Sequence, residues 1–149
     1  RPYLFGSRPA LADFALFGQL QQLAIDPAPA EIMRAQAQRL YDWLRRTDDA
    51  SGVEGEWADE PAETIAELLA LAGRIYFPFL RANAEAFANG AESMSLEIEG
   101  QPFSQGTFKY QVRCYERLRA LWEVLDPASQ DRLEPLLEES GCLAYLSEG

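Results

Sequence analysis

The stretch SRPALADFALFGQLQQLAI, from Ser7 to Ile25, decides the fold, because it is almost free of charge and yet keeps one carboxylate near its start. Between Pro9 and Ile25 the only charged residue is Asp13. A helix over about residues 10–24 would have apolar residues all round its circumference, namely Leu11, Phe14, Leu16, Phe17, Leu20 and Leu23. Helices that are apolar on every side are buried. This segment is therefore predicted to be a buried helix.

The lone carboxylate is placed to close the first turn of that helix. With Ala10 as the N-cap, Asp13 occupies position N3, where an acidic side chain bonds back to the N-cap amide in a capping box. Alanine has no hydroxyl, so only half of the box forms unless Ser7 caps an earlier start. We interpret Asp13 as a structural N-capping residue and not as an acid–base catalyst.

Helical periodicity continues downstream. A one-sided helix is predicted over about residues 30–46, with an apolar face of Ile32, Met33, Ala37, Leu40, Trp43 and Leu44, and a polar face of Arg34, Gln38, Asp42 and Arg45. A third helix over about residues 61–88 contains Pro78, which predicts a kink. Two further helices are predicted over about residues 107–125 and 128–139, with Gly141 as the C-cap of the last.

Two segments do not show this periodicity. The loop Thr47–Pro61 has six acidic residues and no basic one, which is typical of a solvated connector, and its Trp57 is expected to pack back onto the body or onto a partner. Residues Ser95–Glu99 alternate in character and predict a short strand or an extended arm. One strand without a partner does not make a sheet, so the predicted fold class is all-α, a helical bundle.

Composition excludes several classes of function. The 149 residues carry a net charge of −11, which argues against a general nucleic-acid binder and against docking on anionic lipid. No apolar run has the length of a membrane span. The chain has no histidine, which excludes Ser-His and Cys-His nucleophile systems and imidazole metal sites. Two distant cysteines without a CxxC pair fit a reducing, cytoplasmic compartment.

The residues LFGSRPALADFALFGQL resemble the C-terminal domain of the glutathione S-transferases. That family carries a glycine, a short turn and then Ser/Thr-x-x-Asp at the start of a buried helix, which this sequence matches at Gly6 and at Leu11-Ala12-Asp13. Trp43-Leu44 near the end of the second helix resembles the same family. The resemblance is specific over residues 1–46, loose over about 61–88 and weak beyond residue 90. We expect one domain over residues 1–149, with family-like helices over 1–90 and a C-terminal extension over 91–149.

The resemblance implies a helical bundle that starts at the family's central buried helix and lacks the helices before it. The thioredoxin-like domain that holds glutathione and activates its thiol is not in this sequence, so no catalytic, cofactor-binding or metal-binding residue is expected in this chain. That domain of the same protein is the expected partner. An apolar patch is expected where the early helices would pack, and self-association into a homo-oligomer would cover it.

Two functional classes stay open. In the first, the chain is the substrate-side part of a glutathione S-transferase-like enzyme, a hypothesis that the start at Arg1 instead of Met favours. In the second, it is a freestanding helical domain that binds a protein or a small ligand without chemistry.

A few side chains outside the family pattern are candidates for binding or reactivity. Lys109, Arg113 and Arg117 sit four apart on one helix. They either pair with the acidic loop and nearby glutamates, or form an anion site for a carboxylate ligand beside Tyr110 or Tyr76. Cys114 is expected to be packed, and Cys142 to be the more accessible thiol. Glu97 and Glu99 are interpreted as solvated.

Overall fold

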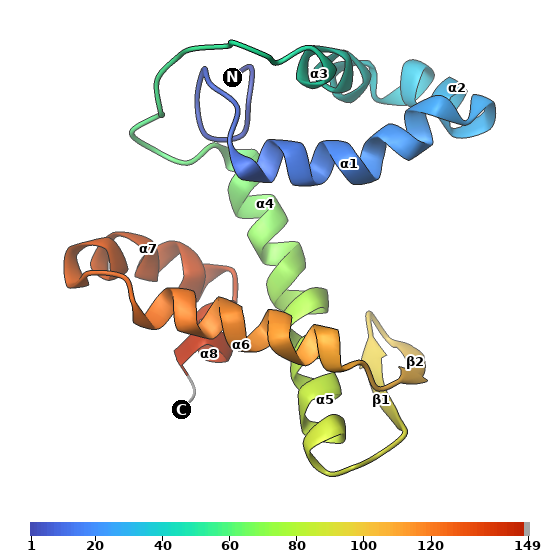
Figure 1. Cartoon of the computed structure of the whole chain (residues 1–149), viewed down its shortest axis with the longest axis vertical. Helices are drawn as coiled ribbons and strands as arrows, with labels where there is room; N and C mark the ends of the chain where they lie inside the picture. The colour runs from blue at the N-terminus through green and yellow to red at the C-terminus, as the bar shows by residue number, and fades with distance from the viewer. Residues whose placement is uncertain (148–149) are drawn as a thin grey trace. The chain divides into compact units, whose positions relative to one another are not determined.

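The computed structural model describes residues 1–147 and is helical apart from one small hairpin (Figure 1). Its contacts divide the chain into two compact units, residues 1–65 and residues 66–149, called here the N-terminal and the C-terminal unit. The predicted helical fold is confirmed, and the hairpin is added to it. The division at residue 65 does not test whether the units act as the single domain expected from the sequence.

Three helices build the N-terminal unit: α1 (Leu11–Ile25), α2 (Pro27–Gln36) and α3 (Gln38–Asp48). Asp26 caps α2, and its side chain accepts a hydrogen bond from the Ala28 N–H. The single helix predicted over residues 30–46 is wrong, because Ala37 leaves the helical conformation at φ −137° and ψ 47° and separates α2 from α3. Both helices still bury apolar residues, Met33 and Leu44.

Helix α1 begins and ends where the sequence predicts, but it is not buried all round. Asp13 is its only buried residue, while Leu11 is 86% and Ile25 67% exposed. Phe14 and Leu23 are also exposed. The other helices of its unit, α2 and α3, pack on it and leave these apolar side chains uncovered. The predicted burial is therefore wrong for this chain, and α1 exposes several large apolar side chains. That they form the patch where the family's earlier helices would pack stays a prediction.

The acidic loop after α3 is anchored to the N-terminal turn. Gly6 pairs with Trp57, the Ser7 N–H donates to the Glu56 carbonyl, and the Ala58 N–H donates to the Phe5 carbonyl. Gly6 has φ +154°, and a side chain there would lie 2.2 Å from the Glu56 carbonyl oxygen. The Arg8 guanidinium lies 4.7 Å from the centre of the Trp57 ring. Trp57 thus contacts its own unit through its backbone and Arg8, while the residue stays 54% exposed.

The long helical run beyond the loop is interrupted before its proline. It consists of α4 (Glu63–Leu71), a π-helical turn η1 (Ala72–Tyr76) and α5 (Phe77–Ala88). Pro78 is the second residue of α5, directly after the π-helical turn. In the π turn the Phe77 N–H reaches back to the Ala72 carbonyl, which alters the backbone hydrogen bonding immediately before the proline. The kink at Pro78 stays a prediction.

A two-stranded antiparallel hairpin follows, made of β1 (Ser93–Ile98) and β2 (Gln101–Gly106). The segment predicted as a short strand or an extended arm is a strand, and β2, which was not predicted, pairs with it from Ile98 opposite Gln101 to Ser93 opposite Gly106. Glu99 and Gly100 both have positive φ, 51° and 76°. Such a pair forms the two-residue turn whose twist suits a hairpin.

The remaining helices, α6 (Lys109–Glu123), α7 (Pro127–Glu139) and α8 (Leu143–Ser147), complete the C-terminal unit, and α6 packs on α5. Helix α8 was not predicted. The core of the unit consists of Phe77, Leu80, Tyr115, Cys142 and Leu146. The fully buried Asn83 of α5 fixes the start of α6, since its amide both accepts from the Phe108 N–H at 2.9 Å and donates to the Phe108 carbonyl at 3.0 Å.

Candidate functional site

The Asp13 carboxylate is a fully buried clamp on two backbone amides. Its Oδ2 accepts from the Ala10 N–H at 2.9 Å, and its Oδ1 accepts from the Leu4 N–H at 3.0 Å. The Asp13 N–H in turn donates to the Ala10 carbonyl, because alanine offers no side-chain acceptor. The Leu4 bond is a second role that the sequence did not reveal: Asp13 ties the N-terminal turn to the start of α1. Both oxygens are occupied within the fold, which is the arrangement of a structural residue.

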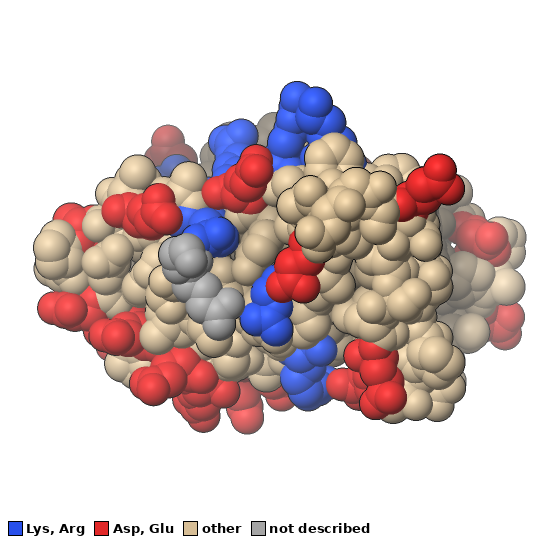
Figure 2. Space-filling model, turned by 90° about the horizontal axis from the view of Figure 1, so that it is seen from below, with Lys and Arg blue, Asp and Glu red and all other residues tan. Residues whose placement is uncertain are grey.

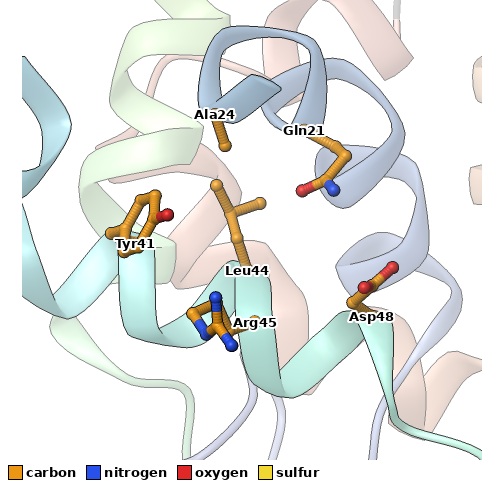
Figure 3. A pocket seen from close by; sticks show the side chains of 6 residues that line it. All are labelled: Gln21, Ala24, Tyr41, Leu44, Arg45 and Asp48. Atoms are coloured by element: carbon orange, nitrogen blue, oxygen red, sulfur yellow. The ribbon is translucent and has the colours of Figure 1, made fainter. Parts of the chain in front are cut away.

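A small pocket of about 150 Å³ lies between α1 and α3. Its lining side chains are Gln21, Ala24, Tyr41, Leu44, Arg45 and Asp48, shown in Figure 3. The four from α3 follow the spacing of one helix face, and the two from α1 are three residues apart. Arg45 is exposed, as predicted for the polar face of its helix, and it also lines this pocket. The signal was present as a polar i, i+4, i+7 series at Tyr41, Arg45 and Asp48.

Arginines surround the phenol of that pocket. Arg34 of α2 donates through Nη1 to the Tyr41 hydroxyl at 3.4 Å, and its guanidinium lies 5.4 Å from the centre of the Tyr41 ring. This hydrogen bond lowers the pKa of Tyr41, and the Arg45 guanidinium acts in the same direction. The phenol therefore faces two positive charges.

The basic series on α6 is exposed to solvent. Lys109, Arg113 and Arg117 are all exposed, and none of them forms an ion pair in residues 66–147. Their neighbour Tyr110 is 75% exposed, so it does not wall a cavity beside them. On the face shown in Figure 2, basic side chains lie among acidic ones and do not form a continuous basic surface. An anion site on α6 stays a prediction.

The accessibility of the two thiols is the reverse of the prediction. Cys142 is fully buried and donates to the Leu69 carbonyl at 3.3 Å, whereas Cys114 is partly exposed. Burial raises the pKa of Cys142, which disfavours its reactive thiolate. The prediction was wrong because the end of α7 turns through Gly141, at φ +72°, and buries Cys142 in the core.

We expect a thiol-alkylating reagent at pH 8 to modify Cys114 at least about tenfold faster than Cys142 in the folded protein. Peptide mapping by mass spectrometry after short labelling times measures this ratio. Equal labelling rates in the native state would contradict the assignment.

The raised pKa of Cys142 also makes the stability of the fold depend on pH. In the unfolded chain the thiol loses its proton at its ordinary pKa of 9.0, whereas the folded chain keeps the proton to higher pH. The free energy of unfolding that this group contributes therefore falls as the pH rises above 9.0.

The remaining candidates are ordinary surface residues. Glu97 is exposed, and Glu99 pairs with Arg74 at 2.9 Å on the surface. Among residues 1–147, no three acidic or cysteine side chains are placed to hold a metal ion. None of the helices in this part of the chain has both the length and the apolar character needed to cross a bilayer.

Comparison with known proteins finds a family similarity within the N-terminal unit. Residues 1–46 match the family described as "Glutathione S-transferase, C-terminal domain". The match covers α1, α2 and most of α3, and it includes the Asp13 clamp. Neither the comparison with curated proteins nor that with solved structures found a match. The first 46 residues of this mostly helical chain are therefore similar to the glutathione S-transferase C-terminal domain.

Proposed function

We propose that this chain is the substrate-side part of a glutathione S-transferase-like protein and is not catalytically competent by itself. In this proposal glutathione is held, and its thiol activated, by a thioredoxin-like domain of the same protein that lies outside these 149 residues. The chain contributes α1 and its apolar surface to the binding of a hydrophobic second substrate. The protein works in a reducing, cytoplasmic compartment.

One observation carries the proposal, the coincidence of the family match with the Asp13 clamp. A buried carboxylate that fixes both the start of α1 and the turn before it gives the helix a defined position. The exposed apolar side chains on α1, among them Leu11 and Phe14, supply the kind of surface on which another element or an apolar substrate packs. The two cysteines are free thiols, which is what a reducing, cytoplasmic compartment predicts.

A second function rests on the same exposed surface. A helical domain with uncovered apolar residues can also bind a protein partner, or a second copy of itself, without any chemistry. In that case α1 is a docking helix and glutathione has no role. The exposed Leu11 and Ile25 would be the contact residues for such a partner.

The test begins with the intact mass of the native gene product. If it carries a further segment of at least about 80 residues with a thioredoxin-like fold, a two-domain enzyme is possible by size. That protein should then conjugate glutathione to an aryl halide, and the 149-residue chain should not. If the native protein lacks such a segment, or if the two-domain protein neither binds glutathione nor conjugates it, the enzyme proposal is wrong. The interaction function then predicts a concentration-dependent mass in sedimentation.

A further inference from the structure

The pocket between α1 and α3 contains one positive and one negative side chain that do not pair with each other. Arg45 and Asp48 both line it, and no ion pair joins them in the described part of the chain. They are three residues apart on α3, which corresponds to a rise of about 4.5 Å along the helix. Opposite charges on one face of a helix that line the same small pocket complement a ligand that carries both charges.

Two neutral side chains of the pocket, Tyr41 and Gln21, can add hydrogen bonds to the charged groups of such a ligand. The Tyr41 oxygen already accepts from Arg34, so its own proton is available to a carboxylate that the Arg45 guanidinium also binds. The Gln21 carboxamide reaches in from α1, and its oxygen can accept a hydrogen bond from an ammonium group bound at Asp48. In Figure 3, Tyr41 and Asp48 stand on opposite sides of Leu44.

Size and charge restrict the ligand further. The pocket measures about 150 Å³, and sites for drug-sized molecules begin at roughly 300 Å³. Its floor is apolar, formed by the buried Leu44 and by Ala24. A phosphate would meet the Asp48 carboxylate, which repels a dianion. We propose that this pocket binds a small free α-amino acid, with its carboxylate on Arg45 and Tyr41 and its ammonium group on Asp48.

Titration with glycine, followed by two-dimensional NMR of the full chain, tests the proposal. We expect saturable shifts at the amides of α3 around Arg45 and Asp48, with a Kd on the order of 10 mM or tighter. Acetate and methylammonium each present only one of the two charges and should bind at least about tenfold more weakly. Absence of saturable shifts with glycine, or equal binding of acetate, overturns the proposal.

Charge-neutral variants show whether both ends of the pocket take part. Asp48→Asn and Arg45→Gln should each weaken glycine binding by about tenfold, and Tyr41→Phe by a few-fold. Asp42→Asn and Arg39→Gln carry the same charge changes on exposed residues of α3 that do not line the pocket, and should leave the affinity unchanged. Thermal unfolding of each variant confirms that the fold is retained. If the control variants weaken binding as much as the pocket variants, general electrostatics explains the binding and the pocket does not.

Discussion

Replacing Asp13 with alanine is expected to lower the free energy of unfolding of the N-terminal unit by about 3 kcal/mol. The carboxylate has no exposed surface, and it accepts the N–H groups of Leu4 and Ala10. Without it, two amides lose a charge-assisted partner where water has little access, and each such loss costs about 1.5–3 kcal/mol. Urea unfolding followed by circular dichroism measures the change. The fluorescence of Trp43 and Trp57 reports on this unit.

Asp26→Ala is the matched control for this experiment. Asp26 also caps a helix of the N-terminal unit, but its hydrogen bond to the Ala28 N–H is exposed. Water can replace that bond, so we expect a loss of only about 1 kcal/mol. Asp13→Asn should have a free energy of unfolding close to that of the alanine variant, because only one of the two terminal atoms of a carboxamide can accept a hydrogen bond. If Asp13→Ala is no more destabilising than Asp26→Ala, the clamp does not hold the N-terminal turn.

The second large effect is expected at Gly73, in the π-helical turn η1. A methyl group there would lie 1.9 Å from the Ser140 carbonyl oxygen, at the turn between α7 and α8. The oxygen belongs to the backbone and cannot rotate away, and Cys142 beside it is part of the core. We expect Gly73→Ala to destabilise the C-terminal unit by about 3 kcal/mol, the upper range for overpacking. Thermal unfolding followed by the fluorescence of Trp122 measures the loss.

Gly18→Ala is the control for the change of residue type. Gly18 lies inside α1 with no atom close to the position of its missing side chain. The same substitution there should therefore stabilise the chain by about 0.5–1 kcal/mol, because alanine favours a helix over glycine. Opposite signs at the two glycines identify the contact with Ser140 as the cause. A neutral or stabilising Gly73→Ala would show that the α7–α8 turn is not packed against η1 in solution.

The start of α1 and the capping role of Asp13 could be predicted because both depend on residues close together in the chain. The capping position of an acid three residues after the N-cap is a local property. Helices α6 and α7 could be predicted for the same reason, because helical periodicity is a local signal. The hairpin was missed because its turn, Glu99-Gly100, lacks the asparagine or aspartate that usually precedes glycine in such turns.

Three features required the tertiary structure, because each depends on segments far apart in the chain. Burial of Cys142 follows from its contact with Leu69, 73 residues earlier. The pocket around Arg45 exists only because α3 packs against α1. The exposure of Leu11 and Ile25 also depends on tertiary structure. Apolar periodicity predicts that a helix surface favours burial, but the neighbouring elements decide whether that surface is covered. The sequence alone thus determined the helices and the capping of the first, and packing decided which of their side chains are accessible.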